Sequence, residues 1–180
     1  MEFEKLNTFG ITGTEQILLG VYLIAHGLIH IVFLFYFNDK KTNVFTGWSG
    51  KSWLLSKFLS GSLIKPIGYI IWASISVLFV ISGLAILDIP DIGNFLVTLL
   101  VFVCCIAIVA FLVFFNDLYP TPYHWILGAI IDVIILAFIL FFSNNVQLLL
   151  IVLIAIWLYG MFVHTKIVSL FITKSTTNQF

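Results

Sequence analysis

The fold of this chain is decided by the stretch EQILLGVYLIAHGLIHIVFLFYF, residues 15–37. It is an almost unbroken apolar run, and a helix needs about 20 such residues to cross the hydrocarbon layer of a bilayer. Two ionisable side chains interrupt the run, His26 and His30, one helical turn apart. Ionisable groups at membrane depth are costly and rare, and they indicate a functional site by default. The stretch therefore predicts a membrane helix that carries a polar site.

Composition extends the membrane interpretation to the whole chain. Of its 180 residues, 62% are hydrophobic and only 9% are charged, whereas a soluble domain carries about 25% charged residues. A soluble fold of this size could not bury that apolar excess and still cover its surface. The bilayer is thus the expected partner. The net charge is zero, and without a basic patch a nucleic-acid partner is not expected.

Five segments have the length of a membrane span: residues 15–37, 67–87, 94–115, 122–142 and 147–168. Short polar or proline-containing breaks separate them, and no internal repeat or linker appears. The sequence before residue 17 lacks the basic region and cleavage site of a signal peptide, so we expect the first apolar run to persist. The predicted fold is all-α, a single membrane domain over residues 1–180 built as a bundle of five transmembrane helices.

The lysines predict the orientation of the bundle. Five of them lie in the loop between the first two spans: Lys40, Lys41, Lys51, Lys57 and Lys65. Lys166 and Lys174 follow the fifth span, and Lys5 precedes the first. With five spans, the five loop lysines, Lys166 and Lys174 all lie on one side of the membrane, and Lys5 lies on the other. Because lysine accumulates in cytoplasmic loops, we expect the N-terminus outside and the C-terminus in the cytoplasm of a cell membrane.

The loop after the first span also carries a helical pattern. Apolar residues recur there at helical spacing: Leu54, Leu55, Phe58, Leu59 and Leu63. Ser56, Lys57 and Ser60 fall on the opposite face, and Trp48 and Trp53 are suited to the membrane interface. This pattern predicts a short interfacial helix over about residues 50–63.

The first span has one polar stripe. At 100° per residue, Glu15, Leu19, Tyr22, His26 and His30 fall within an arc of about 80°. Lipid cannot satisfy such groups, so the stripe should face the interior of the bundle.

The fourth span offers a partner for this stripe. His124, Gly128 and Asp132 follow one another at intervals of four residues and share one face. Asp132 lies about 12 Å deeper than His124, which matches the depth of the two histidines. We therefore predict that Asp132 pairs with His26 or His30, with which it can share a proton. His124 is placed at the cytoplasmic approach to this site, and Gly128 leaves room for a helix or a ligand.

Weaker polar positions occur on the other spans. Tyr69, Trp72, Ser76 and Gly83 share one side of the second. The neighbouring Cys104 and Cys105 lie within the third, where buried thiols are usually inert packing residues.

Several functions fit His26, His30 and Asp132. Histidines at i and i+4 with a carboxylate can bind a metal ion and leave a coordination position open. Haem or quinone binding is a second class of cofactor, although no arginine is present to pair with haem propionates. His and Asp at the midplane also suit a proton relay in a proton-coupled small-solute transporter. A purely structural hydrogen-bond network, in a subunit of a larger membrane complex or a homo-oligomer, is the simplest alternative.

Four short motifs carry a resemblance: AHGLIH in the first span, TGWSGKSWLL in the loop, PIGYIIW from Pro66, and LGAIID in the fourth span. They resemble small prokaryotic membrane proteins with an HGLxH first helix and, distantly, the DoxX-type proteins, which are helical bundles linked in part to quinone-coupled sulfur oxidation. The resemblance implies a redox context and matches His26, His30 and Asp132, but it implies no role for each. The expected function is a ligand-binding or redox-accessory membrane protein whose site includes these three residues, Tyr22 and His124. Whether it is also an enzyme stays open.

Overall fold

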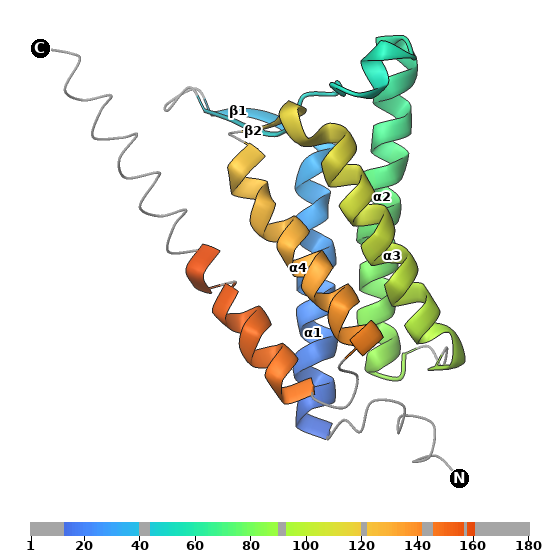
Figure 1. Ribbon diagram of the computed structural model, residues 1–180, viewed down its shortest axis with the longest axis vertical. Coiled ribbons are helices and arrows are strands. Elements are labelled where there is room, and N and C mark those ends of the chain that lie inside the picture. Colours follow the sequence, from blue (N-terminus) through green and yellow to red (C-terminus); the bar gives the residue numbers. More distant parts are fainter. Residues whose placement is uncertain are drawn as a thin grey trace, which may run out of the picture.

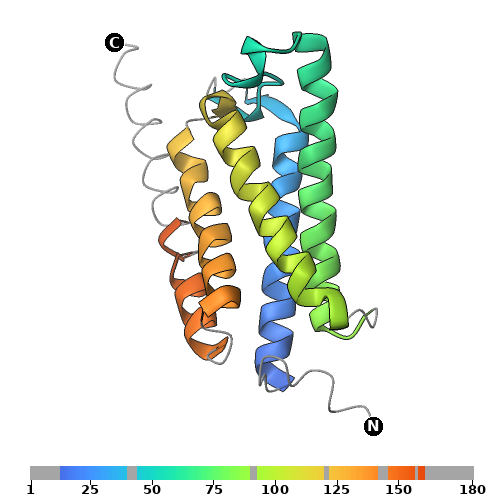
Figure 2. The same ribbon diagram turned by 45° about the vertical axis from the view of Figure 1, so that its right-hand side comes forward.

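A computed structural model of the chain shows a mostly helical bundle (Figure 1). It describes residues 13–39, 44–89, 93–119, 122–141, 146–156 and 158–160. The long helices are α1 (Gly13–His30), α2 (Gly61–Ile86), α3 (Gly93–Phe114) and α4 (Pro122–Phe141). A further helical stretch, Val146–Gly160, follows α4. Each helix runs opposite to the one before it, and Figure 2 shows α1 between α2 and α4.

Three segments are long and apolar enough to cross a membrane: Gly13–Leu34, Gly61–Ile86 and Phe95–Asp117. Two shorter apolar helices, Trp125–Phe141 and Val146–Gly160, accompany them. Large apolar side chains point outwards from these helices, such as Val21 on α1, Phe102 on α3 and Leu140 on α4. An apolar outer surface of this kind suits lipid rather than water.

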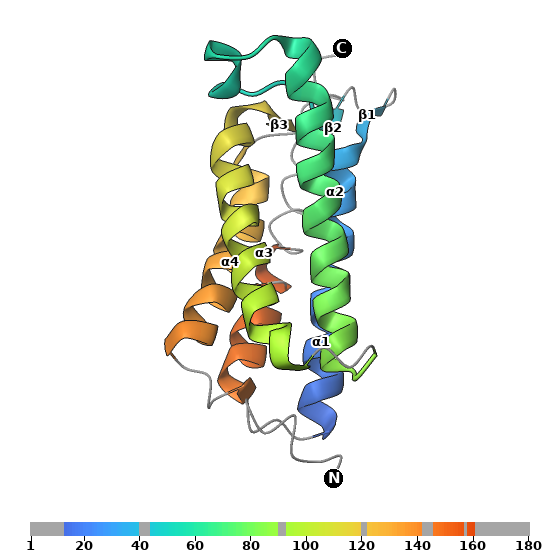
Figure 3. The same ribbon diagram turned by 90° about the vertical axis from the view of Figure 1, so that its right-hand side faces the viewer.

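The expectation of an all-α chain is wrong at one end of the bundle. There, a 3₁₀ turn (η1, Ile31–Leu34) continues α1 and leads into a small antiparallel sheet (Figure 3). Its strands are β1 (Tyr36–Asp39), β2 (Val44–Trp48) and β3 (Leu118–Tyr119), in the order β1-β2-β3. Tyr36 pairs with Gly47, and Gly47 pairs with Tyr119. The sheet thus ties the α1–α2 connection to the α3–α4 connection.

Gly47 is required at the centre of this sheet. Its φ of 107° favours glycine, and a Cβ there would collide with the backbone carbonyl oxygen of Phe35. On β2, the buried Trp48 lies over Gly68 of α2, where a Cβ would collide with the indole ring. The sheet is therefore packed directly on the first turns of α2.

The predicted interfacial helix over residues 50–63 is also wrong as a continuous element. A single 3₁₀ turn, η2 (Leu55–Lys57), stands in its place, and α2 already begins at Gly61. The reason lies in hydrogen bonds to the end of α3. The Trp53 indole N–H donates to the carbonyl of Leu112 at 3.0 Å, and the Ser52 hydroxyl donates to the carbonyl of Val113 at 2.7 Å. These side chains cap the last carbonyls of α3 and so fix the path of the segment against the end of that helix.

Helices α1 and α2 approach each other through glycines. A Cβ on Gly83 would lie 2.6 Å from the carbonyl oxygen of Gly20, and a Cβ on Gly27 would lie 2.8 Å from Cβ of Phe79. Small residues allow such backbone contact between membrane helices. The close approach sets Phe79 of α2 directly against the face of α1 that carries the two histidines.

Candidate functional site

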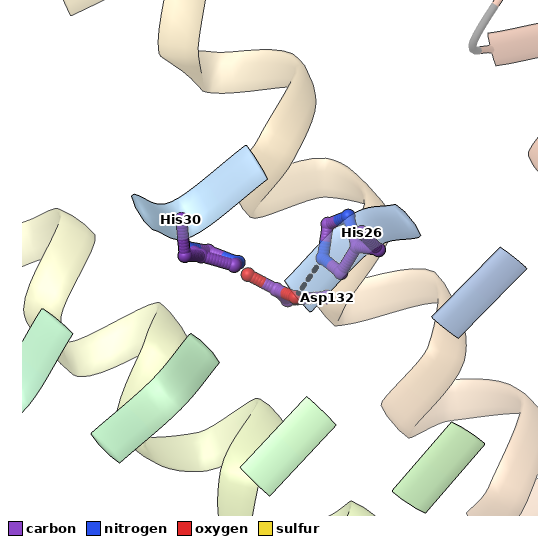
Figure 4. Close-up of side chains that lie close together, drawn as sticks. All are labelled: His26, His30 and Asp132. Atoms are coloured by element: carbon purple, nitrogen blue, oxygen red, sulfur yellow. Dashed lines mark hydrogen bonds and ion pairs between the residues drawn. The ribbon is translucent and has the colours of Figure 1, made fainter. Parts of the chain in front are cut away.

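The site forms where α1 meets α4 inside the bundle. Nε2 of His26 lies 2.8 Å from Oδ1 of Asp132, a hydrogen bond between the imidazole and the carboxyl group (Figure 4). His26, His30 and Asp132 are all buried, with exposed fractions of 4%, 1% and 0%. The pairing of Asp132 with one of the two histidines, predicted from helical phase and depth, is present and involves His26.

His30 completes a compact cluster, although its ring has no hydrogen bond to any described residue. The ligand atoms that His26, His30 and Asp132 offer all lie within 4.8 Å of one another. Figure 4 shows the edge of the His30 ring turned towards the Asp132 carboxyl group. Neither ring nitrogen of His30, nor Oδ2 of Asp132, has a hydrogen-bond partner within the described part of the chain. These three buried polar atoms are thus available to bind a group from outside the described side chains.

Aromatic rings enclose His30 on several sides. Phe79 of α2 is stacked on it, with ring centroids 5.6 Å apart and planes 3° from parallel, and Trp72 is stacked at 6.0 Å. Phe111 of α3 and Phe33 of η1 add tilted contacts at 5.8 and 6.0 Å. Such rings fix the imidazole plane, and they bring few polar groups into the surroundings. The histidine is held in position in an apolar cage.

His26 is held in a similar way on the other side of the cluster. Its ring meets the edge of Phe79 at 4.8 Å, and it is stacked with Tyr22 at 6.2 Å. The Tyr22 hydroxyl and the Trp72 indole nitrogen are buried without a hydrogen-bond partner among the described residues. Orphaned polar atoms therefore occur on three sides of the two histidines.

Other predicted positions fall outside this cluster. The side chain of His124, in the first turn of α4, lies outside the described residues, so its place at the cytoplasmic approach stays a prediction. A Cβ on Gly128 would lie 3.1 Å from the ring of Phe111, so that ring fills the room expected beside the glycine. Cys104 is buried, Cys105 is exposed, and both are free thiols.

The sequence did not single out the rings that form the cage. Trp72 had been placed on a polar face of the second span, but Phe79 and Phe111 had not been connected with the histidines. Trp72, Phe79 and Ile86 repeat every seven residues, and all three are buried. This repeat is the signal from which the inner face of α2 could have been found.

Comparison with known proteins provides no assignment for this site: no protein-family model, no curated protein and no solved structure matches the chain. The chemistry of the cluster has to be argued from its own atoms. It offers a carboxylate oxygen and an imidazole that can donate or accept, in surroundings from which water is largely excluded. Such a set can bind a cation, hold the polar end of a ligand or exchange a proton.

Proposed function

We propose that the chain is a five-span, multi-pass membrane protein that binds a ligand within the bilayer at His26, His30 and Asp132. The observation that supports this proposal is the state of His30. A buried polar group without a partner costs roughly 1–3 kcal/mol, yet His30 has no partner for either ring nitrogen among the described residues. A ligand that uses these atoms offsets that cost.

A hydrogen-bond network that only fixes helix packing explains the unpartnered ring of His30 less well. A network that only fixes helix packing would satisfy its own members, because half-satisfied buried networks are destabilising. His26 and Asp132 meet this condition with their 2.8 Å hydrogen bond. His30 adds neither a bond to that pair nor one to a neighbouring helix within the described segments, so packing alone does not account for it.

The membrane arrangement belongs to the same proposal. The three long apolar helices give the membrane location, and α4 and Val146–Gly160 would serve as the fourth and fifth spans. With lysine on the cytoplasmic side, the sheet end of the bundle faces the cytoplasm of a prokaryotic cell. The likeness to DoxX-type proteins favours a redox-accessory role and keeps a quinone among the ligands to be tested.

Thermal unfolding of the purified full-length protein in detergent tests the binding proposal. The probes are a short-chain ubiquinone, haem and Zn²⁺, each added separately. A ligand at a hundredfold excess over its Kd adds about 2.7 kcal/mol, which for a chain of this size raises Tm by about 5–10 °C. We expect one probe to do so in the wild-type protein and not in His30→Leu.

His164→Leu serves as the matched control. His164 lies in the fifth predicted span, residues 147–168, and is not assigned to the cluster. This variant should keep the full shift. Equal shifts in wild type and His30→Leu, or no shift with any probe, would overturn the proposed site.

A further inference from the structure

We infer that the ligand is a divalent first-row transition-metal ion, coordinated by one ring nitrogen each of His26 and His30 and by the carboxylate of Asp132. This inference rests on the proposed binding function and specifies its ligand. Four observations carry it: the distances within the cluster, the unpartnered atoms, the charge of the site and the types of donor atom.

The distances require only a small adjustment. Bonds from such an ion to imidazole nitrogen and carboxylate oxygen are roughly 2.0–2.2 Å long, so ligand atoms around one ion lie about 3–3.5 Å apart. His26 Nε2 and Asp132 Oδ1 are already 2.8 Å apart, and the widest separation in the cluster is at most 4.8 Å. A shift of roughly 1 Å or a little more between the His30 ring and the Asp132 carboxylate, within the aromatic cage, would close this difference. Coordination by Nε2 of His26 replaces its hydrogen bond to Asp132, and the proton of that bond is released or held on Nδ1. No hydrogen bond from the His30 ring within the described residues would have to break.

The i, i+4 spacing of the histidines holds both rings close to the ion site before the ion binds. Both rings leave the same face of α1, one turn apart, and their centroids are 5.0 Å from each other. Phe79 contacts both rings, and Asp132 approaches from α4. Three donors from α1 and α4 are thus brought together in one cluster, which reduces the entropy cost of binding.

The charge of the site favours a cation. Asp132 is fully buried, and a carboxylate in such surroundings requires a positive partner or a proton. The chain has no arginine, and the described lysines, Lys51, Lys57 and Lys65, are all exposed at the sheet end of the bundle. His26, 2.8 Å from the carboxylate, can hold a shared proton in the metal-free site. A divalent ion would replace this proton as the positive charge beside Asp132 and leave both imidazoles neutral, as coordination requires.

The donor atoms select the class of ion. Two imidazoles and one carboxylate suit Zn²⁺, Fe²⁺, Co²⁺ or Mn²⁺, whereas Ca²⁺ and Mg²⁺ prefer oxygen donors only. Three protein ligands also leave coordination positions open for water or a substrate. The Tyr22 hydroxyl and the Trp72 indole nitrogen, both buried and without a partner among the described side chains, are polar groups that such an exogenous ligand could use.

Co²⁺ binding to the metal-stripped, full-length protein in detergent tests the inference. Co²⁺ replaces the ions of this class, and its visible d–d absorption reports the donor set directly. We expect about one tightly bound Co²⁺ per chain, with a spectrum of nitrogen and oxygen coordination. His30→Leu and Asp132→Asn should each raise the Kd at least tenfold, and His164→Leu should leave it unchanged.

Asp132→Asn is chosen because it keeps the shape of the side chain and removes only its charge, so that a loss of binding does not reflect misfolding. Gel filtration verifies that each variant is monodisperse. Failure to bind Co²⁺, or equal binding by Asp132→Asn and wild type, overturns the metal inference. If quinone or haem still stabilises the wild type but not His30→Leu, the proposed binding function stands without the metal. If no probe binds, both fall together.

Discussion

His30 is the residue on which the functional interpretation depends. Its ring is enclosed by Phe79, Trp72 and Phe111, yet both of its nitrogens lack a partner within the described structure. Each aromatic contact of this kind contributes about 0.5–1.5 kcal/mol, and each of the two unsatisfied ring nitrogens costs roughly 1–3 kcal/mol. An apolar side chain of similar size would keep the packing against these rings and would leave no unsatisfied nitrogen.

Replacing His30 by leucine should consequently stabilise the ligand-free protein. Leucine is similar in volume and carries no polar atom, so we expect the free energy of unfolding to rise by about 1 kcal/mol, the lower end of the cost of one unsatisfied buried nitrogen. Reversible unfolding in mixed micelles, after metal and small molecules have been removed, measures this change. A loss of 2 kcal/mol or more would mean that His30 makes a stabilising bond within the protein.

Part of the site could be predicted from the sequence because helical phase is a local property. The stripe of Tyr22, His26 and His30 and the depth of Asp132 follow from a constant 100° turn per residue. Which histidine meets Asp132 depends on how α1 and α4 are rotated against each other, and this is set by packing. The single 2.8 Å bond to His26 could not be read from either helix alone.

At the scale of elements, the contact between α1 and α2 supports the site. A Cβ on Gly27 would lie 2.8 Å from Cβ of Phe79 and 2.9 Å from the carbonyl oxygen of Ser76, so neither helix can yield by moving a flexible side chain. Because Phe79 contacts both histidines, a shift of α2 would move one wall of the cage.

Gly27→Ala should therefore lower the free energy of unfolding by about 1–3 kcal/mol, as overpacking does, and weaken ligand binding at the same time. Gly61→Ala is the matched control, since no atom outside the local backbone lies within 4 Å of a Cβ there. It should change stability by about 0.5 kcal/mol or less. Equal effects of the two substitutions on stability and binding would contradict the role given to the close contact.

The end of the bundle shows where local patterns fail. Leu54, Leu55 and Phe58 have helical spacing, but the segment instead binds the carbonyls of Leu112 and Val113 at the end of α3. The pairing of β2 with β3 likewise joins residues some 70 positions apart in the chain. Non-local hydrogen bonds outweigh a weak helical preference in a short segment. The partners of these hydrogen bonds cannot be predicted from the sequence of the segment itself.

At the scale of the molecule, the proposed topology has the sheet end in the cytoplasm. Single cysteines introduced in a Cys104→Ala, Cys105→Ala background, at Lys5→Cys, Lys51→Cys or Lys174→Cys, test it with a membrane-impermeant thiol reagent. Lys5→Cys should react in intact cells, and the other two only after permeabilisation. Reaction of Lys174→Cys on the same side as Lys5→Cys would require an even number of spans.

The membrane also determines how much the polar site contributes to holding the helices together. Hydrophobic burial contributes little between helices in lipid, so polar groups and close packing decide how they associate. In the described part of the chain, the hydrogen bond between His26 and Asp132 joins the first helix to the fourth, while the glycine contacts join the first to the second. The cluster thus contacts all four long helices, because Phe79 of α2 and Phe111 of α3 also lie against His30. A ligand there would bridge α1 and α4.

The most direct test of the central claim is an experimental density map of the full-length protein in a lipid nanodisc, purified without chelator. We expect a non-protein feature within bonding distance of both His30 and Asp132, together with the His26–Asp132 contact. A map in which His30 forms hydrogen bonds to protein groups, or in which Asp132 faces lipid, would contradict it.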